Sequence, residues 1–172
     1  TDCCISSIIL TDFIHSDMIF ADLLNDKKPK IIYPVYESER SYNAFPVQRR
    51  QRGRLEVFDN TGTPMPGFPV YNDNQITLPA GEIVGGEFFK PVAVDLDGDG
   101  KLEIVVPDTA GYLYAFGANG NLIWKINIDS FLPEPFRLPH YRSLYKSVAA
   151  GDVDGDGKKD IVVIAQRGLD KL

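Results

Sequence analysis

The stretch Asp95-Leu96-Asp97-Gly98-Asp99-Gly100-Lys101-Leu102-Glu103 decides the fold of this 172-residue chain, and it returns 57 residues later as Asp152-Val153-Asp154-Gly155-Asp156-Gly157-Lys158-Lys159-Asp160. Each copy has acidic residues at positions 1, 3, 5 and 9 of a nine-residue loop, and glycines at positions 4 and 6 permit tight turns with positive φ. Four carboxylates in so short a loop repel one another unless a divalent cation lies among them, and all-oxygen ligands favour Ca²⁺. The sequence therefore predicts two calcium sites.

The predicted ligands in each loop are the four acidic side chains and the backbone carbonyl of position 7. They are Asp95, Asp97, Asp99, Lys101 (carbonyl) and Glu103 in one loop, and Asp152, Asp154, Asp156, Lys158 (carbonyl) and Asp160 in the other. The alternative is a polar turn that binds nothing. Such a turn needs one Asp-Gly pair and not four spaced acids, so the metal-binding interpretation is favoured.

Position 12 and the flanking residues separate this loop from an EF-hand. An EF-hand has a bidentate glutamate at position 12 and helices on both sides, whereas position 12 is Val106 in one copy and Val163 in the other. The flanks are short β-branched runs, such as Val92-Ala93-Val94 before the first loop and Ile104-Val105-Val106 after it. Such runs are typical of buried strands, so each loop is predicted to connect two strands.

A third, altered copy of the loop precedes these two. Residues 21–34 align with residues 94–107, and Asp22 and Asp26 keep the acids of positions 1 and 5. Leu24 and Lys30 replace the acids of positions 3 and 9. A cation here would meet two acids and a positive charge, so we predict no calcium in this loop and expect Lys30 to occupy the space electrostatically.

A second pattern follows each loop. Gly53 to Pro64 aligns with Gly111 to Leu122, and both segments alternate apolar and polar residues before a turn. The turns are at Thr61-Gly62 and at Asn119-Gly120, and the second is a strong signal for a two-residue hairpin. Each unit is therefore predicted to be a four-stranded antiparallel sheet with the acidic loop between its first two strands.

Repetition of four-stranded units of this length predicts an all-β fold of the β-propeller class. The third unit stops early, so we expect a partial β-propeller of about two and a half blades, a fragment whose remaining blades belong to a longer parent chain. The predicted divisions are an N-terminal extension (1–16), a blade with the altered loop and an insertion at 36–52 (17–85), a blade with a calcium loop (86–140) and a truncated blade with a calcium loop (141–172).

Two connecting segments carry basic and aromatic side chains. The insertion at 36–52 is either a loop for an anionic ligand or a solvated surface excursion. The connection 131–146 either grips a sugar or carboxylate or supplies aromatic wedges between blades, and the wedge is favoured for its aromatic residues. The residues concerned are Arg40, Tyr42, Phe45, Arg49, Arg50 and Arg52 in the insertion, and Phe131, Phe136, Arg137, His140, Tyr141, Arg142 and Tyr145 in the connection.

Composition excludes some classes of function. The net charge of −6 comes from the two acidic loops, and two bound Ca²⁺ ions would bring it to −2, so nucleic-acid binding is disfavoured. The only cysteines, Cys3 and Cys4, are adjacent and poorly placed to bridge each other. The apolar run Ile8-Ile9-Leu10 is too short to span a membrane.

The chain resembles the FG-GAP/VCBS-type repeats that build calcium-binding β-propellers, including the head of integrin α chains and many secreted bacterial proteins. The resemblance spans about residues 17–172 and rests on the runs VAVDLDGDGKLEIVV (92–106) and VAAGDVDGDGKKDIVV (148–163). It implies the same two sets of loop ligands. The chain departs from the repeat at Leu24 and Lys30, and Pro107-Asp108-Thr109 stands where integrin-like repeats often have Gly-Ala-Pro. A closer relationship to integrins is therefore not supported.

The resemblance implies a non-catalytic calcium-binding module of a secreted or cell-surface protein that mediates adhesion by binding a protein or carbohydrate ligand. Calcium sites of extracellular modules work at about 10⁻⁴ to 10⁻³ M, which also favours an extracellular location. The alternative is the propeller portion of a secreted polysaccharide lyase or another propeller enzyme. Its candidate residues are Arg49, Arg137, His140 and Arg142, and no active-site motif joins them.

Overall fold

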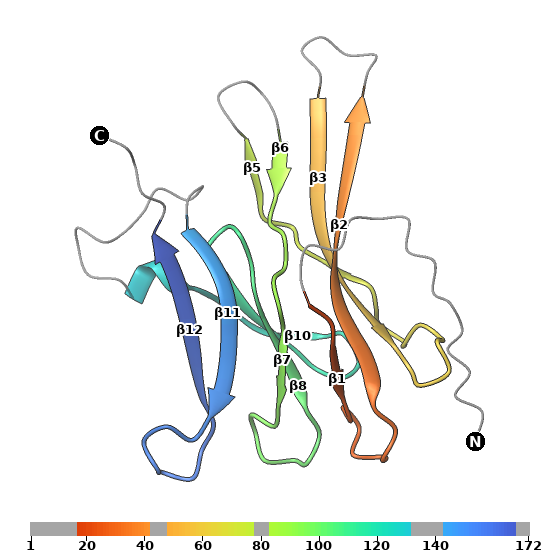
Figure 1. Ribbon diagram of the computed structural model, residues 1–172, viewed down its shortest axis with the longest axis vertical. Coiled ribbons are helices and arrows are strands. Elements are labelled where there is room, and N and C mark those ends of the chain that lie inside the picture. The colour runs from red at the N-terminus through yellow and green to blue at the C-terminus, as the bar shows by residue number, and fades with distance from the viewer. Residues whose placement is uncertain (1–16, 42–47, 78–82, 132–142, 168–172) are drawn as a thin grey trace.

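The computed structural model describes residues 17–41, 48–77, 83–131 and 143–167, which form three β-sheets (Figure 1). The described residues contain no α-helix, and their single helical turn is the 3₁₀ helix η1 (Ile128–Phe131). This confirms the predicted all-β class. Within the described ranges, no helix has the length and apolar character needed to cross a membrane.

The second sheet is the four-stranded antiparallel unit that the sequence predicts. Its strands follow one another as neighbours in the order β10-β9-β8-β7, and the β7–β8 connection is the first acidic loop. The central strand β8 is buried along its whole length, because both faces of the sheet are covered, and this explains its unbroken apolar run. The strands are β7 (Val92–Val94), β8 (Glu103–Pro107), β9 (Tyr112–Phe116) and β10 (Leu122–Asn127).

The first sheet has six strands, whereas the sequence predicts four. The segment expected to be an inserted loop instead lengthens the β2–β3 ladder, which is paired as far as Ser41 with Gln48. A short hairpin, β5–β6, joins this lengthened ladder through one parallel pair, Arg50 with Ile83. The strands are β1 (Ile19–Ala21), β2 (Lys30–Ser41), β3 (Gln48–Phe58), β4 (Val70–Tyr71), β5 (Gln75–Thr77) and β6 (Ile83–Gly85).

The third sheet is a single antiparallel hairpin of β11 (Ser143–Gly151) and β12 (Asp160–Arg167). The second acidic loop connects these two strands. The equivalent hairpins of the other sheets are β7–β8 and β1–β2, so each sheet contains one acidic loop in the same topological position.

The hairpin turns that follow β3 and β9 each contain three residues. The two-residue turn expected at Asn119-Gly120 is therefore wrong. The Gly120 amide donates to the Gly117 carbonyl at 2.9 Å, and the Gly117 amide donates to the Asn121 carbonyl at 2.9 Å. The turn after β3 has the same pair of bonds. The glycine at the third turn position has φ of +78° or +84°, which is the geometry of a type I turn closed by a left-handed residue.

The sheets stack face to face around two apolar cores. One core lies between the first and second sheets and includes Leu55, Ile104 and Phe116. The other lies between the second and third sheets and includes Val105 and Val148. Successive residues of β8 point to opposite faces of its sheet, so this strand contributes to both cores.

A buried carboxylate also links the first two sheets. Asp108 is 0% exposed, and its oxygens accept hydrogen bonds from the side chains of Asn72 (2.9 Å), Asn74 (3.0 Å) and Tyr114 (3.1 Å). Two backbone amides of its own turn complete the set. Burial, followed by the charge of Asp108, raises the pKa of Tyr114, so its hydroxyl remains protonated and able to donate. The buried charge is tolerated because it is fully hydrogen-bonded.

The β9–β10 hairpin turn of the second sheet touches a turn at Met65–Phe68, in the β3–β4 connection of the first sheet, through the two backbones. Gly67 and Gly120 both have positive φ, and a Cβ atom on Gly67 would lie 1.8 Å from the Asn119 carbonyl oxygen. A Cβ atom on Gly120 would lie 2.3 Å from the Gly67 carbonyl oxygen. Glycine is therefore required at both positions by close backbone contact as well as by conformation.

We expect Gly67→Ala to lower the free energy of unfolding much more than Gly62→Ala. Both glycines have nearly the same positive φ, but a Cβ atom on Gly62 meets nothing within 4 Å. Gly62→Ala should cost about 1–2 kcal/mol from backbone strain alone, and the clash at Gly67 should add roughly 1–3 kcal/mol. Urea denaturation measures both values, and equal losses would contradict the interlocked turns.

Candidate metal-binding loops

The altered loop and the two acidic loops lie side by side at one end of the molecule. They are the β1–β2, β7–β8 and β11–β12 connections, at the lower edge of Figure 1. Neighbouring loops are also bonded, because the Leu102 amide of the β7–β8 loop donates to the Leu23 carbonyl of the β1–β2 loop at 3.0 Å. Sequence reasoning missed this bond, which no local motif signals.

Backbone amides orient the carboxylates of the β7–β8 loop. The two oxygens of Asp95 accept from the amides of Gly98 (2.7 Å) and Gly100 (3.0 Å). An oxygen of Asp97 accepts from the Asp99 amide at 3.0 Å. These bonds need the left-handed backbone that both glycines adopt, with φ of +81° and +84°.

The β11–β12 loop repeats this geometry bond for bond. The two oxygens of Asp152 accept from the amides of Gly155 (2.7 Å) and Gly157 (2.9 Å). The position 9 carboxylate of Asp160 accepts from the Val153 amide at 2.8 Å, just as Glu103 accepts from the Leu96 amide at 2.8 Å. The acids accept these bonds and the glycines adopt the positive φ that the bonds need, so these residues determine the loop conformation.

The structure brings three of the four predicted acidic ligands together in each loop. One carboxylate oxygen from each residue lies within 4.8 Å of the others, so each group could hold one ion. Glu103 in one loop and Asp156 in the other lie outside these groups. The groups are Asp95, Asp97 and Asp99 in the β7–β8 loop, and Asp152, Asp154 and Asp160 in the β11–β12 loop.

The donors in both groups suit a hard divalent cation. Every atom offered is a carboxylate oxygen, and the predicted position 7 ligands, Lys101 and Lys158, would add a backbone carbonyl oxygen. Oxygen ligands on a flexible exposed loop fit Ca²⁺ better than Zn²⁺ or Cu²⁺, which favour nitrogen and sulfur. The residues present therefore fit calcium.

A lysine partly neutralises the β7–β8 loop. The Lys101 ammonium lies 3.0 Å from an oxygen of Asp99, whose other oxygen accepts from the Lys101 amide at 2.8 Å. The backbone bond and then the side-chain bond from Lys101 lower the pKa of Asp99. Asp99 in turn raises the pKa of Lys101, so both groups are charged over a wide pH range.

The β1–β2 loop has the same backbone shape without the glycines. Asp22 accepts from the amides of Asp26 (3.0 Å) and Lys27 (2.7 Å), which are positions 5 and 6, whereas the first acids of the other loops accept from positions 4 and 6. Asn25 and Lys27 occupy the glycine positions with φ of +55° and +62°. Asparagine tolerates this conformation better than most residues, and Lys27 is strained there.

The Lys30 ammonium lies where the sequence predicts it. Lys30 is 3% exposed, and its Nζ lies 3.0 and 3.2 Å from the two carboxylate oxygens of Asp26. The same Nζ donates to the backbone carbonyl of Lys28. Asp26 and Lys28 are positions 5 and 7, the positions predicted to hold calcium in the other loops. The bond from Lys30 lowers the pKa of Asp26, which stays ionised beside the ammonium.

Several residues of the two connecting segments lie outside the described residues. They include Tyr42, Phe45, Phe136, Arg137, His140, Tyr141 and Arg142. The predicted N-terminal extension 1–16, with Cys3 and Cys4, also lies outside the described residues. Phe131 is described and is 73% exposed, so the wedge role favoured for the aromatic residues is wrong for this one.

Comparison with known proteins gives one family match. Residues 95–163 match the model of a family described as FG-GAP-like repeat. The match starts at the first acid of the β7–β8 loop and ends after the β11–β12 loop, so it contains both loops with three grouped acids. No curated protein and no solved structure matches the chain. The FG-GAP-type resemblance is thus confirmed for the segment that carries both loops.

We expect Lys30→Met to lower the free energy of unfolding by about 1–3 kcal/mol, because the Asp26 carboxylate and the Lys28 carbonyl lose their shared donor. The matched control is Lys28→Met, which removes an exposed ammonium from the same loop. Urea denaturation of both variants measures the difference. Equal stability of the two variants would show that the buried ammonium has no role in holding the loop.

Proposed function

We propose that this chain, in which residues 95–163 match an FG-GAP-like repeat, is a calcium-binding module of an extracellular β-propeller that binds a protein or glycan. The observation that carries the proposal is the pair of acidic loops with the same hydrogen bonds and with three carboxylates gathered in each. Calcium would hold each loop rigid, and the rigid loops would present a fixed binding surface.

The β1–β2 loop supports the assignment of a cation to the other two. There the chain supplies its own cation, the Lys30 ammonium, against the position 5 carboxylate and the position 7 carbonyl. The other loops have an acid at position 9 in place of Lys30. A loop of this shape therefore places its acceptor oxygens around a positive charge. The loops that lack a lysine at position 9 would need a bound ion to supply that charge.

The proposed extracellular location follows from the exposure of the loops. Their acidic residues are mostly solvent-exposed, which is typical of weak calcium sites with dissociation constants of about 10⁻⁴ to 10⁻³ M. Calcium reaches such concentrations outside cells. The module is proposed to be non-catalytic, since the acids of these two loops are arranged around cation sites.

The proposed propeller rests on how each sheet covers the one before it. At loop position 2, Leu23 is fully buried by the second sheet, and Leu96 packs in the core shared with the third. The equivalent residue of the third sheet, Val153, is 71% exposed. Exposure rises in the same way at an equivalent strand position: Val105 of the second sheet is fully buried, and Val162 of the third sheet is 45% exposed.

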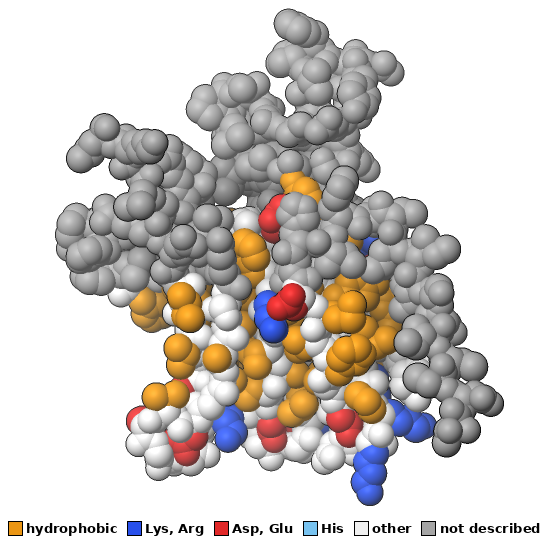
Figure 2. All heavy atoms as spheres, viewed as in Figure 1, with side chains coloured by type: hydrophobic (Ala, Val, Ile, Leu, Met, Phe, Trp, Pro, Cys, Tyr) orange, Lys and Arg blue, Asp and Glu red, His pale blue; other side chains and the backbone are white. Residues whose placement is uncertain are grey.

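The outer face of the third sheet is therefore apolar and uncovered, as expected of a face that packs against another sheet. Figure 2 shows hydrophobic side chains gathered over the β11–β12 hairpin, where Ile164 is 63% exposed. Because this face repeats the positions by which the second sheet covers its neighbour, its proposed occupant is a further four-stranded repeat. The propeller is completed by such repeats.

We expect the chain to bind two calcium ions, one in each of the β7–β8 and β11–β12 loops. Binding to the folded state alone should add about 2.7 kcal/mol of stability per site at a hundredfold excess over the dissociation constant. Asp97→Asn and Asp154→Asn should each remove one ion. Isothermal titration calorimetry gives the number of ions, and thermal unfolding with and without calcium gives the stability.

Two variants serve as controls for this titration. Asp59→Asn alters an acid that accepts backbone amides in a hairpin turn but belongs to neither acidic group, so both ions should remain. Leu24→Asp combined with Lys30→Glu restores four acids to the β1–β2 loop and should raise the number of ions to three. Absence of calcium binding to the unaltered chain, or no rise in its melting temperature, would rule out the proposed function.

We expect the chain to self-associate through the uncovered face of the third sheet. Val162→Lys combined with Ile164→Lys should make the chain monomeric, because charges prevent apolar burial. The control is Leu122→Lys combined with Ile123→Lys, two equally exposed apolar residues on another sheet, which should leave association unchanged. Sedimentation equilibrium measures the mass, and an unaltered chain that stays monomeric at high concentration would contradict the uncovered face.

A further inference from the structure

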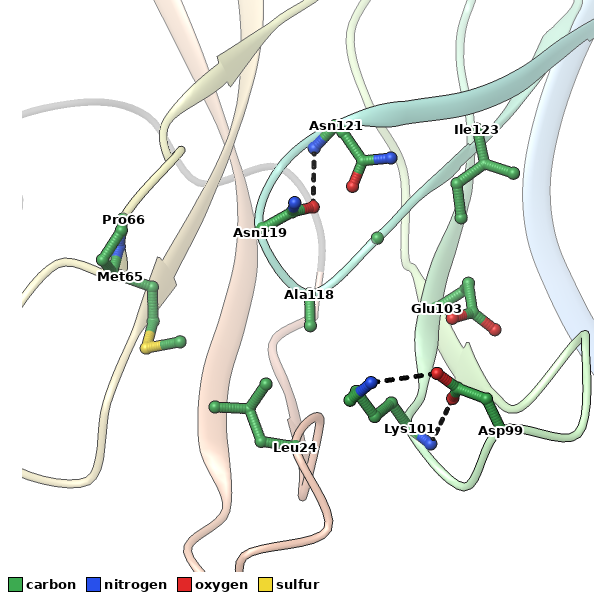
Figure 3. Close-up of a pocket in the computed structure, with 11 residues that line it drawn as sticks. Leu24, Met65, Pro66, Asp99, Lys101, Glu103, Ala118, Asn119, Asn121 and Ile123 are labelled. Carbon is green, nitrogen blue, oxygen red and sulfur yellow. Dashed lines mark hydrogen bonds and ion pairs between the residues drawn. The ribbon is translucent and has the colours of Figure 1, made fainter.

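A cavity of about 460 Å³ adjoins the β7–β8 loop. Four connections surround it: the β1–β2 loop, the β7–β8 loop, the β3–β4 connection and the β9–β10 turn (Figure 3). The volume lies in the range typical of small-molecule sites. The cavity exists only because the first and second sheets are stacked, since each sheet supplies part of its wall.

The walls combine apolar patches with amides. Leu24 and Met65 come from the first sheet, and Ala118 comes from the β9–β10 turn. Asn119 and Asn121 line the same turn, and the backbone N–H of Asn121 donates to the Asn119 side-chain oxygen at 3.3 Å. Apolar walls with a few convergent polar groups are the usual composition of a ligand site.

The charged part of the lining belongs to the proposed metal loop. Asp99, Lys101 and Glu103 line the cavity and together carry a net charge of −1. A calcium ion in this loop would change the local charge to +1, and Asp99 would be shared between the ion and Lys101. The Lys101 ammonium, now beside a divalent cation, would then be stabilised by an anion in the cavity.

We propose that this cavity binds a hydroxyl-bearing carboxylate of the uronic acid class when calcium occupies the β7–β8 loop. This inference rests on the proposed calcium site. The ligand carboxylate pairs with the Lys101 ammonium. The amides of Asn119 and Asn121 offer donors and acceptors to hydroxyl groups, and Leu24 and Met65 lie against the C–H face of the ring.

The distribution of polar groups favours a sugar acid over an acidic peptide. A peptide carboxylate would use the ammonium, but the peptide groups able to pair with the two side-chain amides lie on a flexible chain that must be ordered on binding. A uronate carries its charge and several hydroxyl groups on one compact ring, which matches one cation and two nearby amides. Acidic peptides are therefore tested as the competing ligand.

The experiment is an NMR titration of the whole chain with galacturonate, with galactose as the neutral counterpart. At saturating calcium we expect galacturonate to shift the amide signals of Asn119 and Asn121. Galactose, and galacturonate in the presence of EDTA, should bind at least about tenfold more weakly, a difference of 1.4 kcal/mol. Equal binding of galactose, or equal binding without calcium, would overturn the proposal.

Two variants locate the binding. Lys101→Met, titrated at saturating calcium, should weaken galacturonate binding about tenfold or more because the ammonium is lost. The matched control is Lys90→Met, which removes a half-exposed lysine paired with Asp17 at 3.2 Å, away from the cavity, and should not change binding. Ala118→Phe fills the cavity while keeping every charge, so it should abolish galacturonate binding and retain calcium binding.

Calcium titration of the same samples separates the two possible failures. Absence of calcium binding overturns the proposed function and this inference together. Calcium binding without any galacturonate shift overturns this inference alone. Tighter binding of an acetylated aspartyl peptide than of galacturonate would also overturn it, because the cavity would then recognise a protein ligand.

Discussion

The position 1 carboxylate, with two backbone amides donating to it, is the interaction on which the rest of the structure depends. Asp22, Asp95 and Asp152 each accept from the position 6 amide and from one further amide, which is that of position 5 in the β1–β2 loop and that of position 4 in the other two. This pair of bonds folds nine residues into a compact loop and thereby brings two strands into antiparallel register. The loop persists in the β1–β2 connection, where other acids and both glycines have been replaced, so this bond pair is its minimal requirement.

The folded loop concentrates negative charge, and each copy balances this charge differently. In the β1–β2 loop Lys30 provides a buried ammonium. In the β7–β8 loop Lys101 pairs with one carboxylate from the outside, and in the β11–β12 loop the acids are exposed to solvent. The proposed calcium sites are thus the two loops in which the chain supplies no internal cation. Under this proposal, the loop of one repeat is stabilised by its own lysine, whereas the loops of the other two are stabilised by a bound ion.

Stacking between sheets determines the remaining properties. A sheet of short strands is unstable alone, and each of these sheets gains its core from its neighbour. The Asp108 hydrogen-bond network and the contact of Gly67 with Gly120 fix the first two sheets against each other. The cavity beside the β7–β8 loop is a product of the same stacking.

The sequence by itself determined the strand-loop-strand units, the loop conformation and the position of Lys30, because these depend on residues only a few positions apart. It also identified the acids that the structure groups, such as Asp95 and Asp97. Only the tertiary structure decided that the first sheet has six strands and that the hairpin turns have three residues. It also decided the hydrogen-bond network around Asp108 and the cavity beside the β7–β8 loop. Each of these depends on contacts between residues far apart in the chain or on backbone geometry that several turn sequences can adopt, and no local pattern encodes such contacts.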